Sequence, residues 1–437
     1  MSLADASRAT RIRYALLAVA TANAFLLYLD RICMTAVVDS DSFKHSIALS
    51  GSHMGTVKAS FFYAYALGQL PAGWLAGRFG TRRMLVVYIV LWSICTALTG
   101  FMNGLITLVA VRLVCGVAEA GAYPASARVI ALWFPYAHRA RASSVVAFGG
   151  RLGGSLAPAL TAAAIVALGS WRPVLWIYGA FGCVLALLTW IIFRDDPESH
   201  PWANEEERQL IRAGLPAPRG PVFRFPWREL LRHRGLWLLS LGSVGMNLGW
   251  ALLIFNLGAY FKDVRGLDHL TANFYVTMVL SCGMVGMLFG GWWCDWLTRR
   301  FGPRWGRRLP FFVGSATAVT AYLLCPILGS PVTVAIACAC VAIAADSMIP
   351  AVWSLCQDIG GNQSAITLGW ANMWGNLGAG ALADIIPWVL ARSWRHADWR
   401  EVFWFCAGGF VLLAICVCFV DGTRRLCPDE SGKVPGQ

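Results

Sequence analysis

Of the charged side chains inside long apolar segments of the N-terminal half of the chain, five could form one functional cluster. They are Asp30, Arg31, Arg112, Glu119 and Arg151. An ionised side chain in an apolar membrane interior is expensive, so each of these groups needs a partner or a function. Arg112 and Glu119 are seven residues apart, which places them on one face of a helix. Asp30 and Arg31 are neighbours whose side chains point about 100° apart, so they cannot fully satisfy each other.

Internal ion pairs are one explanation of these charges, with Asp30 bonded to Arg112 and Glu119 bonded to Arg151. Three arginines face only two acids, so this pairing leaves Arg31 unmatched. A buried, unmatched guanidinium is suited to binding a carboxylate ligand through two parallel hydrogen bonds. Glu119 is shielded from water, which favours its protonated form, as in a reversible proton carrier. Its protonation would release an arginine and so couple the binding of an anion to that of a proton.

Other polar and aromatic residues in apolar segments could orient a ligand. Asp346 is either a second proton carrier or a structural hydrogen-bond partner. The other candidates could equally serve helix packing, and they are Tyr65, Trp353, Asn372 and Asn376, with Tyr28, Tyr63, Asn247, Trp250 and Asn256 as weaker ones.

Composition indicates that these residues sit in membrane-spanning helices. Apolar residues make up 57% of the 437 positions and charged residues only 14%, whereas soluble domains carry about 25% charged residues. A membrane span needs about 20 mostly apolar residues. Twelve such segments are expected, near 13–37, 54–77, 84–102, 105–132, 141–168, 173–193, 236–261, 270–296, 309–328, 331–357, 364–391 and 401–420.

The net charge of +13 reflects membrane topology. Most Lys and Arg residues fall in segments that are cytoplasmic if the N-terminus is inside, which predicts an inner (plasma) membrane protein with both termini in the cytoplasm. A nucleic-acid partner is therefore not expected. The 14 cysteines lie mostly within apolar segments, where they serve as small packing residues. We expect no metal and no cofactor.

A hydrophilic segment at 194–235 divides the spans six and six. We expect an N-terminal bundle at 1–193, a cytoplasmic linker at 194–235, a C-terminal bundle at 236–421 and a cytoplasmic tail at 422–437. Motifs recur between the two bundles at nearly constant spacing: the loop 73–83 matches 291–302, and Trp171-Arg172 matches Trp399-Arg400. Such parallel repeats are typical of secondary transporters with a substrate site near the midplane, exposed alternately to either side.

The two recurring loop motifs follow the second and eighth spans. Their glycines allow tight turns, and their charged residues could form pairs between helices that hold one conformational state. The residues concerned are Gly73, Arg78, Arg82 and Arg83 in the first motif and Asp295, Arg299 and Arg300 in the second.

The first of these motifs resembles the loop motif of the major facilitator superfamily, with Gly77 where that motif has an aspartate. The second copy keeps the acid as Asp295. More narrowly, the chain resembles the anion:cation symporter family over essentially all spans. That likeness rests on Asp30-Arg31 at the end of the first span, on the pattern Arg112…Gly116…Glu119…Pro124, and on the run from Asn372 to Gly378.

The resemblance implies proton symport of a carboxylate such as a sugar acid. It implies that Arg31 binds the substrate, that Asp30 and Glu119 carry protons, and that Arg112 is coupled to them. It also implies substrate contacts from Tyr65, Trp353 and Asn372. Two departures have consequences. Gly77 weakens the first loop motif, and Arg151 as a second arginine favours a substrate with two anionic groups or a bulky aromatic acid.

The implied partners are a small organic anion, a proton and the lipid bilayer, and the protein is expected to be monomeric. An organophosphate/phosphate antiporter is the alternative transporter, but it would need an arginine from each half, and the seventh span has none between Leu236 and Tyr260. A non-transporting receptor with a transporter fold is a further alternative, but such receptors usually carry a soluble segment longer than the expected tail at 422–437. The sequence contains no HExxH or GxSxG motif, so an enzyme is not expected.

Overall fold

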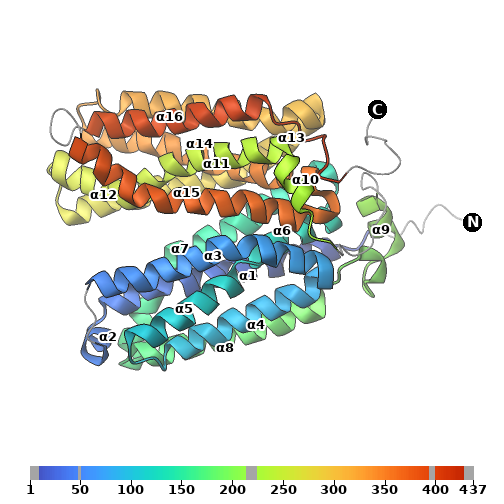
Figure 1. Ribbon diagram of the computed structural model, residues 1–437, viewed down its shortest axis with the longest axis horizontal. Coiled ribbons are helices and arrows are strands. Elements are labelled where there is room, and N and C mark those ends of the chain that lie inside the picture. The colour runs from blue at the N-terminus through green and yellow to red at the C-terminus, as the bar shows by residue number, and fades with distance from the viewer. Residues whose placement is uncertain (1–8, 48–50, 213–223, 393–398, 428–437) are drawn as a thin grey trace, which may run out of the picture. The chain divides into compact units, whose positions relative to one another are not determined.

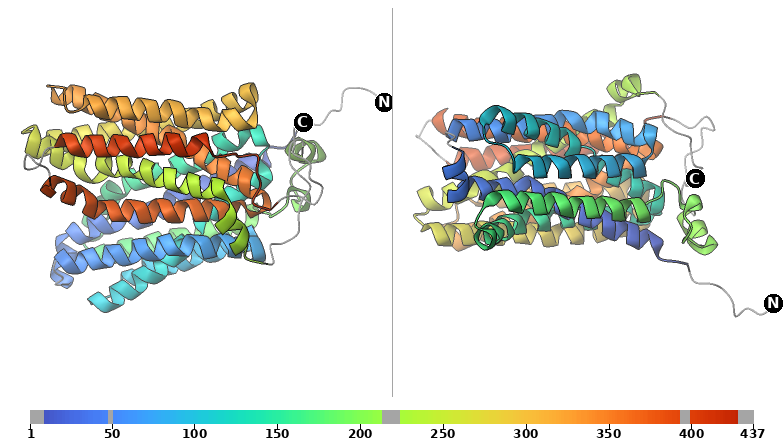
Figure 2. Two further views of the ribbon diagram at one scale, coloured as in Figure 1. Left: turned by 45° about the horizontal axis from the view of Figure 1, so that its top comes forward. Right: turned by 90° about the horizontal axis from the view of Figure 1, so that it is seen from below.

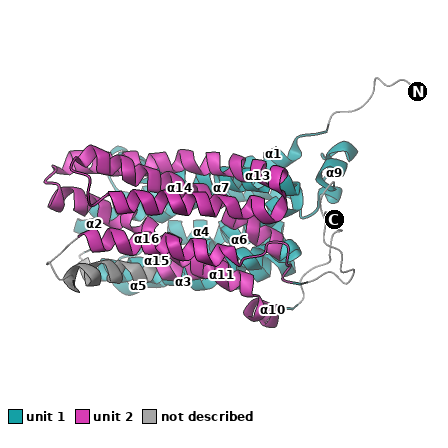
Figure 3. Cartoon of the chain, turned by 90° about the horizontal axis from the view of Figure 1, so that it is seen from above, with its two compact units in different colours: residues 1–225, 360–369, 427–437 teal, residues 226–359, 370–426 magenta. Residues whose placement is uncertain are grey.

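The computed structural model describes residues 9–47, 51–212, 224–392 and 399–427. No strand occurs in these ranges. Part of the expected linker, 213–223, and most of the expected tail, 428–437, lie outside the described residues. The chain separates into two compact units (Figure 3). Unit 1 contains residues 1–225, 360–369 and 427–437, and unit 2 contains residues 226–359 and 370–426.

Unit 1 is built from long helices that lie side by side (Figures 1 and 2). Within it, α1 packs on α7, α3 on α5, and α4 on α8. Two short helices, α2 and α9, lie outside the bundle. The bounds are α1 (Ile12–Asp39), α2 (Asp41–Ser46), α3 (Gly51–Phe79), α4 (Thr81–Thr99), α5 (Leu105–Glu119), α6 (Ala122–Trp133), α7 (Arg139–Leu168), α8 (Trp171–Ile192) and α9 (Glu205–Arg212).

Unit 2 is also helical, and in it α16 packs on α11 and α13. Helix α15 begins in the part of the chain that belongs to unit 1. The bounds are α10 (Trp227–Arg232), α11 (Arg234–Ala251), a π-helical turn (Leu252–Asn256), α12 (Leu257–Ala259), a second π-helical turn (Tyr260–Val264), α13 (His269–Leu324), α14 (Pro331–Gly360), α15 (Ser364–Arg392) and α16 (Trp399–Cys418).

Nine helical stretches within the described ranges are long and apolar enough to cross a membrane. One of them, α13, has 56 residues and contains the expected span 270–296 and all but the last four residues of the expected span 309–328. It is broken at Gly302, whose φ of 76° and ψ of 173° are not helical. Glycine adopts such a positive φ without the steric penalty of a Cβ, so the chain turns between the two expected spans at this residue.

Small residues allow the closest helix contacts in each unit. In unit 1, a Cβ at Gly153 of α7 would collide with the backbone of Phe25 in α1. In unit 2, Gly245 of α11 and Gly409 of α16 face each other's backbones in the same way. Without side chains at these positions the helices approach to backbone contact, which is the usual basis of tight helix association in membranes.

The described part of the linker docks on the N-terminal end of α1 through Glu207 of α9. The Glu207 carboxylate is fully buried and accepts hydrogen bonds from the backbone N–H groups of Ile12 and Arg13, at 3.1 and 3.2 Å. It also accepts one from the Thr10 hydroxyl at 2.5 Å. A carboxylate at the first turn of a helix satisfies unpaired N–H groups and complements the helix dipole. The linker helix is therefore an integral part of unit 1.

Candidate functional site

Arg31 and Glu119 form a buried ion pair in unit 1. The Arg31 Nε and Nη2 atoms both donate to Glu119 Oε2, at 3.1 and 3.0 Å. The Glu119 side chain is fully buried, and that of Arg31 is only 7% exposed. Glu119 is the last residue of α5, which brings its carboxylate within reach of α1. The expectation that pairing leaves Arg31 unmatched is therefore wrong.

Aromatic rings surround the Arg31 guanidinium. Its Cζ lies 4.0 Å from the ring centre of Tyr65, 4.8 Å from that of Tyr28 and 5.4 Å from that of Phe61. Phe61 and Tyr65 stack at 6.1 Å on α3. A guanidinium within about 6 Å of a ring face is attracted by the ring electrons. These rings hold the Arg31 side chain in place. Its Nε and Nη2 donors, which a carboxylate can bind, face Glu119.

A glycine explains how α5 reaches this position. A Cβ at Gly116 would lie 2.5 Å from the Phe61 carbonyl oxygen and 3.0 Å from the Tyr65 nitrogen. Only glycine lets α5 approach α3 so closely. The approach brings Glu119, three residues later, beside the aromatic residues around Arg31. Gly116 thus has a positioning role in the motif Arg112…Gly116…Glu119.

Asp30 points away from Arg31, into the interior of unit 1. It is 1% exposed, and neither carboxylate oxygen has a hydrogen-bond partner with normal geometry. Trp92 and Thr96 of α4 lie close to it, and Arg112 of α5 attracts it electrostatically. Arg112 is itself buried. The structure thus brings Asp30 and Arg112 into one polar cluster, next to the Arg31–Glu119 pair but oriented to a different side of α1.

Arg151 lies on α7, half-buried, and interacts electrostatically with Tyr123. Tyr123 packs edge-on against Tyr28, with ring centres 6.0 Å apart. The Tyr123 hydroxyl occupies the space that a side chain at Gly150 would fill. Arg31 and Arg151 are thus connected through two tyrosines, Tyr28 and Tyr123, and both arginines belong to unit 1.

Among the remaining ligand candidates, Tyr63 lies exposed on α3 of unit 1, and the others belong to unit 2. Asp346 and Trp353 of α14 are buried, at 4% and 5% exposure. One Asp346 carboxylate oxygen would lie 2.6 Å from a Cβ at Gly283, so α14 sits close against α13 there. On α15, the side-chain nitrogen of Asn376 donates to the Asn372 carbonyl oxygen at 2.7 Å. That bond uses one of the two N–H donors of Asn376 and leaves its amide oxygen as an acceptor.

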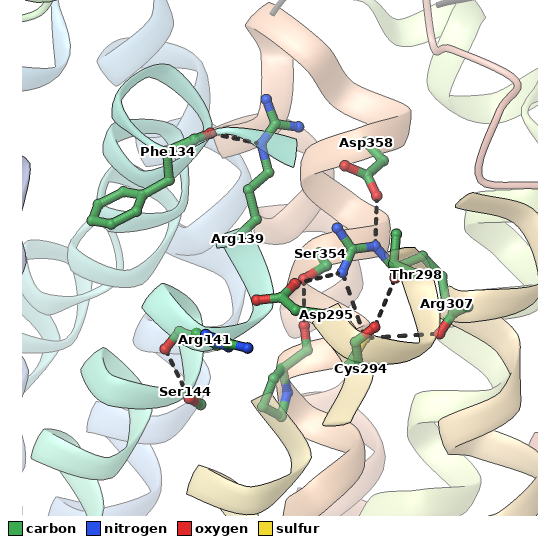
Figure 4. A network of polar contacts seen from close by, with 12 residues as sticks. Phe134, Arg139, Arg141, Ser144, Cys294, Asp295, Thr298, Arg307, Ser354 and Asp358 are labelled. Atoms are coloured by element: carbon green, nitrogen blue, oxygen red, sulfur yellow. Dashed lines mark hydrogen bonds and ion pairs between the residues drawn. The ribbon is translucent and has the colours of Figure 1, made fainter. Parts of the chain in front are cut away.

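The second loop motif has its acid in a buried charge network in unit 2 (Figure 4). The Arg307 guanidinium lies between two carboxylates: Nη1 donates to Asp295 Oδ1 at 3.2 Å, and Nε donates to Asp358 Oδ2 at 3.1 Å. Asp295 and Arg307 are fully buried. Arg299 and Arg300 are exposed. The acid of this motif is therefore bonded to Arg307, a residue that the sequence analysis did not single out.

Replacing Arg307 with methionine is expected to destabilise the protein by about 3–5 kcal/mol, because it leaves two carboxylates buried without their cation. Thermal unfolding of the purified protein measures the loss. Arg304→Met, at an exposed arginine in the same helix, is the matched control and should leave the midpoint unchanged. Neutralising the carboxylates as well, in R307M with D295N and D358N, should recover much of the loss. No recovery would show that the side chain of Arg307 acts through packing instead of charge.

The first loop motif, in unit 1, has different contacts. Gly73 lies against the 360–369 segment of the same unit, where a Cβ would come within 2.5 Å of the Ala365 carbonyl oxygen. Arg78 is exposed and lies over the Trp74 ring at 5.0 Å. Arg82 stacks on Trp190 at 3.9 Å and donates from Nε to the Trp190 carbonyl oxygen at 2.9 Å. Arg83 is exposed.

Comparison with known proteins supports the transporter-like arrangement of these helices. Residues 20–383 match the model of the Major Facilitator Superfamily. The chain belongs to the major facilitator superfamily. This membership confirms the predicted fold class, an all-helical membrane transporter, and it confirms that the protein is not an enzyme.

Relatives in this superfamily are named for organic acids. The chain is 32% identical over 311 residues to the probable sulfoacetate transporter SauU of Cupriavidus necator, with 70% of each chain covered. It is 30% identical over 286 residues to the probable galactarate/D-glucarate transporter GudP of Escherichia coli K12, covering 61% of this chain and 63% of GudP. Among solved structures, the human organic anion transporter MFSD10 shares the fold with a TM-score of 0.70 at 15% identity, covering 93% of this chain and 99% of that one.

Two structural features of this superfamily member escaped sequence reasoning. The triad of Arg307, Asp295 and Asp358 could have been suspected, because Arg307 and Asp358 directly flank apolar segments. The buried Arg128 was visible as a charge within a span, but nothing in the sequence indicated its neighbours. Helix rotation and long-range pairing decide both features, and neither follows from residue spacing within one helix.

Proposed function

We propose that the protein is a proton-coupled symporter of an organic anion, a member of the anion:cation symporter family that works by alternating access. The observation that carries the proposal is the Arg31–Glu119 pair, in which a buried guanidinium is bound to a carboxylate that can be neutralised by one proton. A substrate carboxylate and Glu119 compete for the same two Arg31 donors. Protonation of Glu119 releases these donors, so the anion binds best together with a proton.

Asp30 and Arg112 are proposed to take part in the same proton transfer. An ionised carboxylate that is buried without a hydrogen bond is unfavourable, and Asp30 is in that situation. Arg112 supplies the positive charge that compensates Asp30 when it is ionised. Asp346 of unit 2 is proposed to act either as a second proton carrier or as a structural hydrogen-bond partner.

The substrate is proposed to be a small dianion. Arg31 would bind one acid group and Arg151 the other, with Tyr28, Tyr65 and Tyr123 lining the path between them. Sulfoacetate, galactarate and D-glucarate, which are named for the relatives, each carry two acid groups. From the C-terminal half, Trp353, Asn372 and Asn376 are proposed to contact the rest of the substrate.

The layout proposed for this function has twelve spans in two pseudo-symmetric bundles, 1–193 and 236–421, joined by the linker 194–235 and followed by the tail 422–437. The protein would lie in the inner (plasma) membrane as a monomer with both termini in the cytoplasm. The loop residues Gly73, Arg78, Arg82 and Arg83 and their counterparts Asp295, Arg299 and Arg300 would hold one state of the cycle.

Reconstitution in liposomes tests the proposal. With radiolabelled sulfoacetate, galactarate or D-glucarate outside, an inwardly directed proton gradient should drive accumulation above the equilibrium level, and a protonophore should abolish it. Accumulation that follows a sodium gradient, or that ignores the proton gradient altogether, would overturn proton symport. Exchange against internal phosphate would instead favour the antiporter alternative.

A further inference from the structure

The two loop motifs differ in the residue that should supply a negative charge. In unit 2 that residue is Asp295, which is buried and bonded to Arg307. In unit 1 the matching position is Gly77. Unit 1 nevertheless buries an arginine close to this loop: Arg128 lies on α6, which packs against both α3 and α4. A buried cation beside a loop that has lost its acid needs a negative charge from elsewhere.

Two nitrogens of the Arg128 guanidinium lack hydrogen bonds among the described residues. Its side chain is only 8% exposed, and its Nε and Nη1 atoms have no hydrogen-bond partner. A buried guanidinium without compensation is strongly unfavourable. The acid whose charge acts on Arg128 is Asp195, the second residue of the linker that follows α8.

Asp195 also caps the N-terminus of α4. Its Oδ1 atom accepts the backbone N–H of Arg82 at 2.7 Å, and the residue at the N-cap of that helix, Gly80, has no side chain to do so. A carboxylate at this place satisfies a free N–H group and complements the positive end of the helix dipole. It also lies beside the Arg82 side chain, which it attracts electrostatically. Asp195 thus faces the charges of the first loop motif.

The backbone of the loop is shaped around this carboxylate. Gly80 has a φ of 94°, and a Cβ there would lie only 2.6 Å from Asp195 Oδ2. The glycine of the motif is therefore required both by its backbone conformation and by the approach of Asp195. Next to Asp195, the Arg194 carbonyl oxygen accepts a hydrogen bond from Trp133 Nε1 at 3.0 Å. Since Trp133 ends α6, this bond fixes the start of the linker on the helix that carries Arg128.

We propose that Asp195 supplies the acid that the first loop motif lacks at Gly77. It compensates Arg128 and the N-terminus of α4, and it positions the α3–α4 loop in the conformation that the transport cycle needs. Asp195 is a positioning residue and does not touch the substrate. The effect on transport rests on the proposed function, whereas the effect on stability does not.

Thermal unfolding and anion exchange of the full-length protein test this proposal together. Asp195→Asn should lower the unfolding midpoint by at least about 3 °C and slow exchange several-fold. The matched control is Asp196→Asn, at the neighbouring carboxylate, whose Oδ1 accepts the Glu198 N–H at 3.1 Å in a short turn. That control should change neither quantity. Equal behaviour of the two variants would overturn the proposal.

Relocating the charge gives the sharper result. Gly77→Asp added to Asp195→Asn should restore at least about half of both losses, because the acid returns to the position it has in the second motif. A folded double variant without any recovery would refute the role. If Gly77→Asp prevents folding, Arg128→Gln provides the test instead. Its effect on the unfolding midpoint should be non-additive with that of Asp195→Asn. Simple additivity of the two effects would refute the coupling.

The stability measurements keep this test separate from the function. If the protein moves none of the tested anions but Asp195→Asn and its charge relocation change the midpoint as expected, the proposed substrate fails and the role of Asp195 stands. If exchange proceeds but the midpoints of Asp195→Asn and Asp196→Asn coincide, the role of Asp195 fails and the proposed function stands.

Discussion

Replacing Arg31 with alanine is expected to weaken binding of the organic anion by at least about 100-fold. Each hydrogen bond to a charged group is worth about 1.5–3 kcal/mol, and Arg31 offers two donors, Nε and Nη2, which here both contact Glu119 Oε2. Binding can be measured by calorimetry with sulfoacetate, galactarate or D-glucarate. Arg31→Lys should recover little of the affinity, because lysine keeps the charge but not the planar pair of donors.

The alanine variant leaves Glu119 buried without its cation, which could unfold the protein and mask the result. The variant R31A/E119Q removes both charges and avoids this problem. It should be compared with E119Q alone, which keeps Arg31 and frees its donors. If R31A/E119Q binds the anion as tightly as E119Q does, Arg31 does not anchor the substrate.

Sequence alone identified the residues of the unit 1 cluster but not all of their partners. Charges inside apolar segments stand out because their burial is expensive, and helical spacing predicted a shared face for Arg112 and Glu119. Spacing within one helix cannot give the rotation of another helix about its axis. That rotation turns Arg31 towards Glu119 and Asp30 towards Trp92 and Thr96. The partner of Glu119 therefore had to come from the structure.

The second loop motif shows the same limit over a longer distance. Asp295 was expected to pair between helices, but its partner Arg307 lies beyond the break at Gly302, and the third member, Asp358, comes from the end of α14. Such a triad depends on three backbones meeting at one point. In the first motif the loss of the acid at Gly77 was evident from the sequence, whereas the position of Asp195 over Gly80 depends on how α8 ends.

Glu119→Gln is expected to separate exchange of the anion from its accumulation. Glutamine keeps the shape of the protonated side chain but cannot release a proton, so Arg31 stays available and the substrate still binds. Exchange of internal for external substrate in liposomes should remain within a few-fold of the unmodified protein. Uptake driven by a proton gradient should fall to the level reached without one, because no proton leaves Glu119 during the cycle.

The pH dependence of binding provides the second measurement on this variant. In the unmodified protein, affinity for the anion should fall as pH rises, since ionised Glu119 competes for Arg31. In E119Q the affinity should stay constant over the same range. Asp263→Asn, at an exposed carboxylate outside the cluster, should leave both accumulation and pH dependence unchanged. If the Glu119→Gln protein still accumulates substrate against its gradient, Glu119 does not carry the coupling proton. The buried carboxylate of Asp30 would then be the next candidate to carry it.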